Sequence, residues 1–196
     1  MTTATPSLSI FDHLWTNARL VVATMFVCCV LYTLLILGIG QTFTPFSANG
    51  YLLYNDKGEL VGSSQIAQSF TKPEYFWPRP SAVDYNAAAT GGSNLSPASK
   101  ELRERAEKTI ALYGATESNK IPADLVTASG AGMDPHITLA GAEYQLDRVA
   151  AARGLDKAVV RGLIQEHATI PGGPLTNAPI VNVLELNIAL DALTKK

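Results

Sequence analysis

The chain has 196 residues and a mass of 20.9 kDa, with 15 basic and 17 acidic side chains and a formal net charge of -2. This length fits one domain, or one domain with an appendage, and a content of 47% hydrophobic residues excludes a disordered chain. The net charge excludes a basic nucleic-acid-binding protein, which needs an excess of lysine and arginine to contact phosphates. Charged residues, 16% of the total, are unevenly distributed, because residues 20–55 contain none. The chain therefore consists of an apolar N-terminal segment and a more polar remainder.

The uncharged run from Leu20 to Gly40 predicts one membrane-spanning helix. At about 1.5 Å per residue its 21 residues would extend over about 31 Å, close to the thickness of the hydrocarbon core of a bilayer. Trp15 precedes the run and Phe43 follows it, as expected for aromatic residues in the two headgroup regions. Arg19 is the one strong positive charge near either end, and the positive-inside rule then places the N-terminus in the cytoplasm. We expect a cytoplasmic segment over 1–19, a transmembrane helix over 20–41 and an extracytoplasmic (periplasmic) domain over 42–196.

A cleaved signal peptide is the alternative interpretation of the same run. Gly38-Ile-Gly40 resembles a cleavage site with small residues, but the apolar run is longer than the 7–15 residues of a signal peptide and little positive charge precedes it. An uncleaved anchor is therefore favoured. The two cysteines of the chain, Cys28 and Cys29, are adjacent within this run, so we expect them to pack and the domain to fold without disulfides.

The first part of the domain is predicted to contain a hairpin followed by irregular segments. Two apolar runs that flank a polar turn at 55–58 predict a β-hairpin over 51–62, and a short helix is expected over 64–70. Three prolines and three aromatic residues over 72–82 exclude regular structure there, and a long irregular stretch follows to Ser96. Loops of this length within a compact domain are often functional.

The rest of the domain is predicted to be rich in helices. Four helices are expected, each beginning at a capping residue. Three extend from Ser96 to Gly114, from Thr138 to Gly154 and from Asp156 to about Ala168. The fourth begins at Asn182, the first residue of a capping box, and continues into the C-terminal segment. A strand over 180–183 is also considered. The fold class is thus a single N-terminal transmembrane helix plus one α+β, helix-rich extracytoplasmic domain with a small β-sheet or hairpin.

No sequence motif in the chain indicates a catalytic centre. There is no phosphate-binding P-loop, and Ser129 lacks the glycine two residues earlier that a nucleophile elbow requires. Asp134 and His136 are too few ligands for a metal site, so we expect no metal and no cofactor bound by this chain. A membrane-anchored envelope hydrolase that uses Ser129, Asp134 and His136 is kept as a rival hypothesis, and cleavage after Gly40 would allow a periplasmic binding protein.

The aromatic and proline-rich segment after Lys72 is the most distinctive surface candidate. Tyr75, Phe76, Trp77 and Arg79 are predicted to dock a partner, because tryptophan and arginine dominate the energetics of protein interfaces. The alternative is a loop that Phe76 and Trp77 attach to the domain's own core.

Five segments resemble the C subunit of the bacterial Kdp potassium-transporting P-type ATPase. They occur in the order of that family and, with the N-terminal apolar helix, extend over nearly the whole chain: Tyr75-Phe-Trp-Pro-Arg-Pro-Ser81 with Asp84-Tyr-Asn86, Gly91-Gly-Ser-Asn-Leu95, Pro122-Ala-Asp-Leu-Val-Thr-Ala-Ser-Gly130, Asp134-Pro-His136 and Val181-Asn-Val-Leu-Glu-Leu-Asn187.

The resemblance implies an accessory subunit, without a catalytic centre, of a high-affinity potassium uptake pump in the bacterial inner membrane. Its partners would be a potassium-binding, channel-like subunit and a P-type ATP-hydrolysing subunit, together with membrane lipid, and ATP and potassium would be handled by the complex. The Asp-Lys-Thr-Gly phosphorylation motif of P-type pumps is absent from this chain. The family has also been credited with promoting ATP binding, and the resemblance implies Ser129, Gly130 and Gln145 as the residues to consider for such contact.

Overall fold

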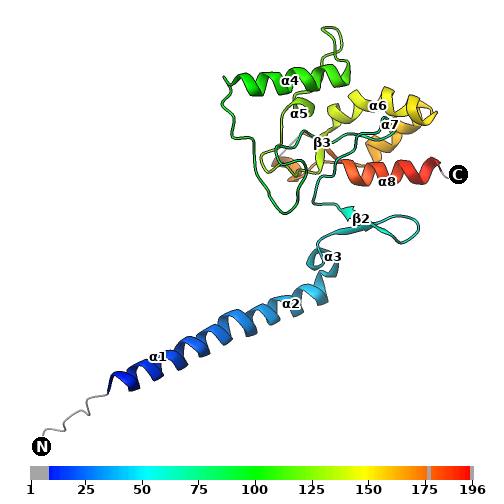
Figure 1. Cartoon of the computed structure of the whole chain (residues 1–196). Coiled ribbons are helices and arrows are strands. Elements are labelled where there is room, and N and C mark those ends of the chain that lie inside the picture. The colour runs from blue at the N-terminus through cyan, green and yellow to red at the C-terminus, as the bar shows by residue number, and fades with distance from the viewer. Residues whose placement is uncertain (1–8, 176–177, 195–196) are drawn as a thin grey trace, which may run out of the picture. The chain divides into compact units, whose positions relative to one another are not determined.

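The structure is a computed structural model that describes residues 9–175 and 178–194. Two compact units, Met1–Gly50 and Tyr51–Lys196, follow one another along the chain. Figure 1 shows the first as a long helix and the second as a helix-rich domain.

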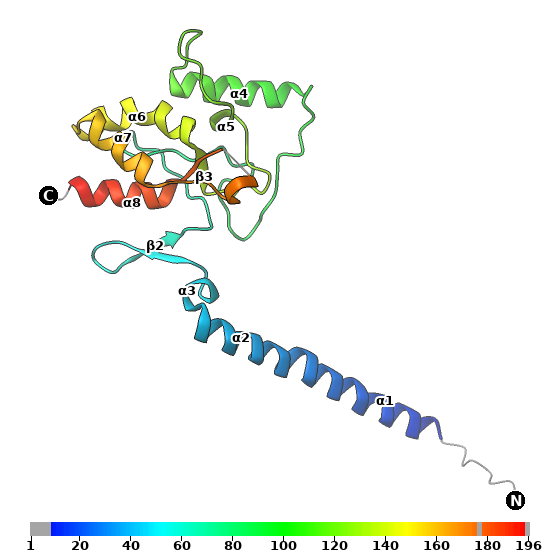
Figure 2. The same ribbon diagram turned by 180° about the vertical axis from the view of Figure 1, so that it is seen from behind.

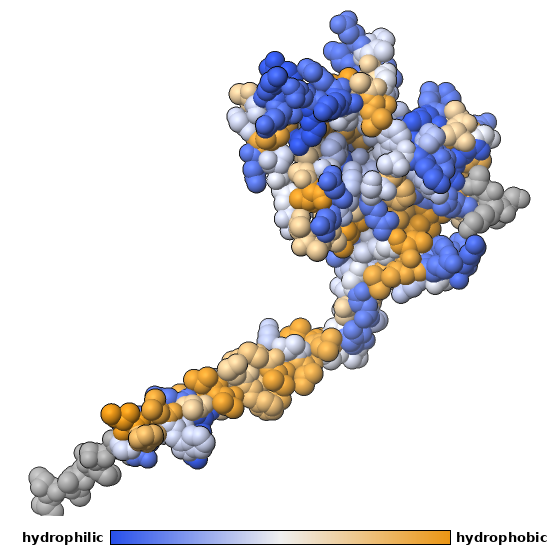
Figure 3. All heavy atoms as spheres, in the orientation of Figure 1, coloured by the Kyte–Doolittle hydropathy of each residue, from blue (hydrophilic) through white to orange (hydrophobic). Residues whose placement is uncertain are grey.

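The first unit is one continuous helix over Ile10–Phe43, followed by the short helix α3 (Pro45–Ala48). The long helix consists of α1 (Ile10–Met25), a π-helical segment (Phe26–Leu31) that contains both cysteines, and α2 (Tyr32–Phe43). Among the described residues it is the one helix long and apolar enough to cross a bilayer. Its apolar side chains are exposed, as the largely orange surface of this helix in Figure 3 shows, and such a surface suits lipid. These features support single-pass membrane anchoring.

The helix begins ten residues before the predicted span. Ser9 and Asp12 form a capping box, in which the backbone N of each residue donates to the side chain of the other at 3.0 and 3.3 Å. This cap starts the helix within a polar segment. The predicted start is based on the uncharged run alone, which does not include that segment. The bounds of the membrane span within the helix stay a prediction.

The predicted hairpin is confirmed, whereas the helix predicted after it is wrong. Strands β1 (Leu52–Tyr54) and β2 (Leu60–Ser63) pair antiparallel, with Gly58 in the turn at a φ of 76°. Residues 64–70 contain no helix. The side chain of Gln68 donates to the carbonyl oxygen of Val61 at 2.8 Å, and the backbone N of Ala67 donates to that of Met133 at 3.0 Å. These contacts with other segments replace the hydrogen bonds of a local helix.

The first long helix of the domain, α4 (Lys100–Tyr113), begins three residues later than predicted. Ser99 is its N-cap, while the carbonyl oxygen of Ser96 accepts from the backbone N of Ser99 in a preceding turn. The predicted C-terminal cap at Gly114 is confirmed by its left-handed conformation. The short helix α5 (Ala123–Val126) follows.

The core lies between three helices and a three-stranded sheet. Helices α6 (Leu139–Arg153), α7 (Lys157–Glu166) and α8 (Val183–Thr194) pack in sequence, and Figures 1 and 2 show them side by side. The predicted caps Thr138, Asp156 and Asn182 are confirmed, because each side chain accepts a backbone hydrogen bond. The sheet is antiparallel in the order β3-β5-β4, formed by β3 (His136–Thr138), β5 (Ile180–Asn182) and β4 (Ala168–Thr169). Strands β3 and β4 are absent from the sequence prediction. The helix-rich α+β fold class is confirmed.

Candidate functional site

The four predicted docking residues lie in an extended segment that has neither helix nor strand. Phe76 has 0% of its surface exposed and belongs to the hydrophobic core, so its side chain is not part of an outer surface. Tyr75, Trp77 and Arg79 are half-buried. The segment Tyr75–Arg79, called the docking loop below, is therefore buried at Phe76 and Pro78 and reaches the surface at the other three residues. Its role in docking stays a prediction.

Two buried side-chain amides hold the backbone of the docking loop. Asn187 of α8 accepts from the backbone N of Phe76 at 2.9 Å and donates to its carbonyl oxygen at 3.0 Å. Gln145 of α6 makes the same pair of bonds with Trp77: it accepts from the backbone N at 2.8 Å and donates to the carbonyl oxygen at 3.0 Å. Each amide thus satisfies both polar groups of one residue, as a neighbouring β-strand would do. The loop can pass through the interior without a strand beside it.

Arg148 of α6 reinforces the same loop from one side. Its guanidinium donates to the carbonyl oxygens of Pro73 and Tyr75 at 2.6 and 3.0 Å and to Oε1 of Gln145 at 2.6 Å. It also lies 3.8 Å from the centre of the Trp77 ring, a distance that allows a cation–π interaction. Burial lowers the pKa of this guanidinium from its usual value.

A second arginine fixes the start of the loop to α8. Arg153, with a side chain only 5% exposed, forms an ion pair with Asp191 at 2.8 Å and donates to the carbonyl oxygen of Glu74 at 2.7 Å. The Tyr75 hydroxyl donates to the same carboxylate at 3.2 Å. Burial, with the charge of Asp191, raises the pKa of Tyr75. The Tyr75 side chain is thereby oriented by two helices.

The end of the loop is fixed by an ion pair. Arg79 contacts Asp134 at 3.0 Å, and Asp134 accepts from the backbone N of His136 at 3.0 Å and lies 3.2 Å from its Nδ1. Burial by itself would raise the pKa of the Asp134 carboxyl, but the hydrogen bonds from His136 and the charge of Arg79 outweigh burial and lower it. His136 thus acts as a hydrogen-bonding residue within β3.

Two of the three residues implied for nucleotide contact also hold the docking loop or its continuation. Gln145 is 1% exposed and its amide is used by Trp77 and Arg148, as described above. Ser129 is 3% exposed, and its backbone N donates to the carbonyl oxygen of Pro80 at 3.2 Å. Gly130, which follows Ser129, is exposed. Contact of these residues with a nucleotide stays a prediction.

The rival hydrolase hypothesis needs a nucleophile close to its base. The hydroxyl of Ser129 accepts from the backbone N of Asp134 at 3.5 Å, whereas the ring of His136 contacts the carboxylate of Asp134. Within the described part of the chain, no hydrogen bond joins Ser129 to His136. The structure therefore brings the three residues near one another but does not align them as a catalytic triad.

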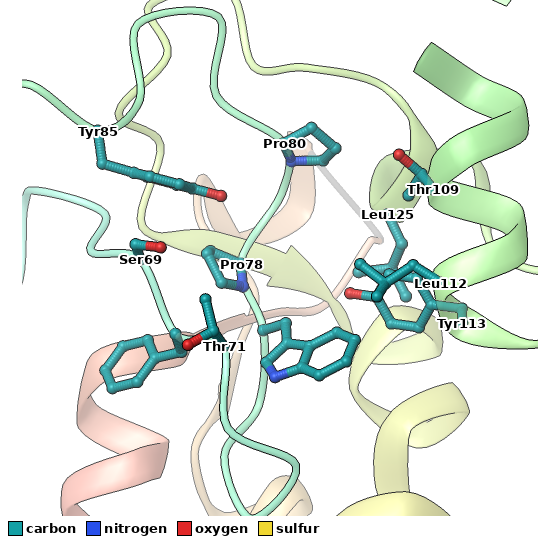
Figure 4. A pocket seen from close by; sticks show the side chains of 11 residues that line it. Ser69, Thr71, Pro78, Pro80, Tyr85, Thr109, Leu112, Tyr113 and Leu125 are labelled. Atoms are coloured by element: carbon teal, nitrogen blue, oxygen red, sulfur yellow. The ribbon is translucent and has the colours of Figure 1, made fainter. Parts of the chain in front are cut away.

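A pocket with a volume of about 290 Å³ lies between the docking loop and α4. Aromatic residues and prolines form most of its wall: Phe70, Trp77, Pro78, Pro80, Tyr85 and Tyr113. Figure 4 shows Pro78 and Pro80 on one side of this space and Tyr113, with Thr109 and Leu112, on the other. The rings of Trp77 and Tyr113 pack edge to face, with their centres 5.2 Å apart. The pocket is thus an apolar hollow beside the docking loop.

Sequence reasoning missed the residues that hold the loop, namely Asn187, Arg148, Arg153 and Asp191. The available signal is a polar residue on a helix face that is otherwise apolar. Asn187 lies between the fully buried Leu186 and Leu190 and is itself 2% exposed. A buried amide at such a position requires hydrogen-bond partners, but the sequence does not say which ones.

The chain is similar in sequence to known proteins over most of its length. A sequence model of KdpC, described as K+-transporting ATPase, c chain, matches residues 14–192. The chain is 56% identical over 175 residues to the potassium-transporting ATPase KdpC subunit of Parvibaculum lavamentivorans, an alignment that covers 89% of this chain and 94% of that one. It is 43% identical over 187 residues to the protein of the same name from Shewanella putrefaciens, covering 94% of each. For that of Gloeobacter violaceus the identity is 39% over 188 residues, covering 96% and 100%.

Proposed function

This chain belongs to the KdpC family, the c chains of K+-transporting ATPases, and from this premise we propose that it is a non-catalytic accessory subunit that assembles a potassium uptake pump. It joins and stabilises a potassium-binding, channel-like subunit and a P-type ATP-hydrolysing subunit. Potassium binding and ATP hydrolysis belong to those partners. Membership of the family supports a part in potassium transport, and the assembling role is our inference from the docking loop.

The observation that carries the proposal is the rigid presentation of the docking loop. Two amides, two arginines and one ion pair hold the loop and the residue before it, while Tyr75, Trp77 and Arg79 remain half-buried at the surface. A surface that is already ordered loses little conformational entropy when a partner binds. Aromatic and arginine side chains of this kind are frequent in the energetically dominant part of interfaces.

Direct contact with ATP is the less favoured role of this chain. Gln145 already uses both ends of its amide within the domain, and Ser129 is almost fully buried. A nucleotide would have to displace these hydrogen bonds, which would expose the backbone of Trp77. Promotion of ATP binding by the partner, through assembly, requires no such change.

The test of assembly is co-purification. The full-length chain carries an affinity tag and is expressed together with the two larger subunits of its own pump, then extracted in mild detergent. We expect both larger proteins to be recovered with it, and no ATPase activity from the chain alone. Recovery of the chain as a lone monomer from potassium-starved cells would contradict the proposal.

We further propose that the chain spans the bacterial inner membrane once, with its N-terminus in the cytoplasm and residues 42–196 in the periplasm. Arg19 at the N-terminal side of the apolar run supports this orientation. The test is labelling of a single cysteine with a membrane-impermeant maleimide, in a Cys28→Ser, Cys29→Ser background. Ser96→Cys should react in intact spheroplasts and Thr3→Cys only after lysis, whereas the opposite pattern would reverse the orientation.

A further inference from the structure

The pocket between the docking loop and α4 is preformed. Trp77 on its wall is held by the Gln145 amide and by the stacked guanidinium of Arg148. Tyr113 contacts the ring of Trp77 and also that of Tyr144, with centres 5.2 and 6.1 Å apart. An occupant therefore meets walls that need no rearrangement, which reduces the entropic cost of binding.

The chemistry of the wall requires an uncharged occupant. None of the residues that line the pocket carries a charge. A cation would find no carboxylate in the wall, and the Trp77 ring already interacts with the guanidinium of Arg148, at 3.8 Å from its centre. An anion would find hydroxyl groups but no cationic side chain in the wall, and its desolvation would not be compensated.

One half-buried hydroxyl in the wall, that of Tyr113, has no partner in the described part of the chain, whereas Ser69 and Thr71 are exposed to water. The hydroxyl of Tyr85 donates to the carbonyl oxygen of Arg79 at 2.9 Å, but that of Tyr113 makes no hydrogen bond with any described residue. Figure 4 shows the two hydroxyls directed toward the middle of the pocket from opposite sides. Burial raises the pKa of Tyr113, so its hydroxyl keeps its proton and is a donor. The occupant should supply an acceptor such as a carbonyl oxygen.

We propose that the pocket receives one uncharged aliphatic or proline side chain from an extended segment of a partner subunit, with a main-chain carbonyl of that segment accepting from Tyr113. Aromatic grooves with prolines and hydroxyl groups suit such segments, whose carbonyls are free because they form no internal hydrogen bonds. A lipid chain would leave the hydroxyl of Tyr113 without an acceptor. The inference rests on the proposed assembling function and assigns it a binding site.

The experiment uses the tagged full-length chain co-expressed with the two larger subunits of its pump. Thr109→Trp fills the pocket from α4, and Lys108→Trp places the same side chain on the exposed face one residue earlier as the matched control. Tyr113→Phe removes the free hydroxyl and keeps the ring. In a separate sample the photo-crosslinker p-benzoylphenylalanine replaces Leu112, which is 67% exposed at the pocket, or Lys108 as its control.

We expect Thr109→Trp to reduce the recovery of the larger subunits at least about tenfold, as for loss of a central interface side chain. Tyr113→Phe should reduce it about fivefold, the effect of one lost hydrogen bond, and Lys108→Trp should not reduce it. The crosslinker at position 112 should join a peptide of a larger subunit, whereas that at position 108 should not.

Three results separate failure of the pocket from failure of the assembling function. Full recovery with Thr109→Trp and Tyr113→Phe, or crosslinks from position 112 to lipid or detergent only, overturns the pocket and leaves assembly intact. Recovery of no larger subunit with the unaltered chain overturns both. If Thr109→Trp abolishes the thermal unfolding transition, Tyr113→Phe and the crosslinks decide, because the first keeps the ring of Tyr113 and the second alters only the largely exposed Leu112.

Discussion

At Trp77 one glutamine side chain satisfies two polar groups of the main chain that are removed from water. The amide of Gln145 contacts the backbone N and carbonyl oxygen of Trp77, and the same amide oxygen accepts from Arg148. At the scale of single residues, the docking loop therefore depends on buried amide side chains such as that of Gln145. Their removal should affect the stability of the domain before it affects any partner.

Gln145→Leu should reduce the free energy of unfolding by about 2–4 kcal/mol, because it leaves two main-chain groups and part of a guanidinium without partners. The measurement is denaturant unfolding of the full-length chain in detergent. Gln165→Leu, at an exposed position of α7, is the matched control and should change stability by at most about 0.5 kcal/mol. Equal stability of the two variants would show that Gln145 does not hold the loop.

The lowered pKa of Asp134 makes its ion pair with Arg79 sensitive to acid. A carboxyl whose pKa is lower in the folded than in the unfolded protein adds stability above its ordinary value of 3.8, and this is lost as the pH falls through the folded pKa. Asp134→Asn should therefore be less stable than the unaltered chain at pH 7, with a difference that shrinks below about pH 4. The measurement is the free energy of unfolding of Asp134→Asn and of the unaltered chain, at pH 7 and below about pH 4. Glu107→Gln, on the exposed face of α4, is the control, and a constant difference for Asp134→Asn would contradict the assignment.

At the scale of elements, the long loop after the docking loop and the segment before β3 pack closely together at Gly91 and Gly132. Gly132 has a φ of 72°, and a Cβ atom there would lie 2.6 Å from Cγ2 of Val83 and 3.0 Å from the carbonyl oxygen of Gly91. The hydroxyl of Ser81 donates to the carbonyl oxygen of Gly132 at 2.6 Å. The long loop after the docking loop is thus packed against the segment before β3, which fixes it without regular structure.

Gly132→Ala should reduce the free energy of unfolding by about 1–3 kcal/mol, since it combines a disfavoured backbone conformation with overpacking. Gly162→Ala is the matched control, because that glycine lies within α7 and a Cβ atom there meets nothing within 4 Å. This change should leave stability equal or raise it by up to about 1 kcal/mol. Thermal unfolding of both variants gives the comparison, and similar melting temperatures would contradict the packing argument.

At the scale of the whole molecule, the chain consists of a membrane helix and a domain with its own core. The apolar side chains of the helix are exposed over its length, whereas those of the domain are buried among α6, α7, α8 and the sheet. Lipid must therefore surround the apolar side chains of the helix and remove them from water, as the core does for those of the domain.

Leu34→Arg should impair membrane insertion, because a charge near the middle of the bilayer costs about 2.5–3.5 kcal/mol on insertion scales. Thr42→Arg is the control, since an arginine near the end of the span can extend its charged group to the interface. The measurement is the fraction of chain that resists alkaline extraction from membranes. Equal extraction of the two variants would contradict a span that holds Leu34 inside the hydrocarbon core.

The features that depend on neighbouring residues were predictable from sequence. The apolar run, the hairpin turn and the caps Thr138, Asp156 and Asn182 are each recognisable within a few residues, and the structure confirms them. The burial of Leu146 and Val149 on one face of α6 follows from helical periodicity. The first helix began earlier than the charge-free run, because its capping box lies in polar sequence.

By itself, the sequence determined that an apolar helix precedes a helix-rich domain, and the order of its motifs indicated the family. Only the tertiary structure decided how the docking loop is held, because its partners lie 68 and 111 residues away along the chain. It also decided that β3 and β4 exist, since two- and three-residue strands become stable only when β5 lies between them. Caps and periodic faces are local properties of the chain, whereas a buried amide finds its partner only after the helices have packed.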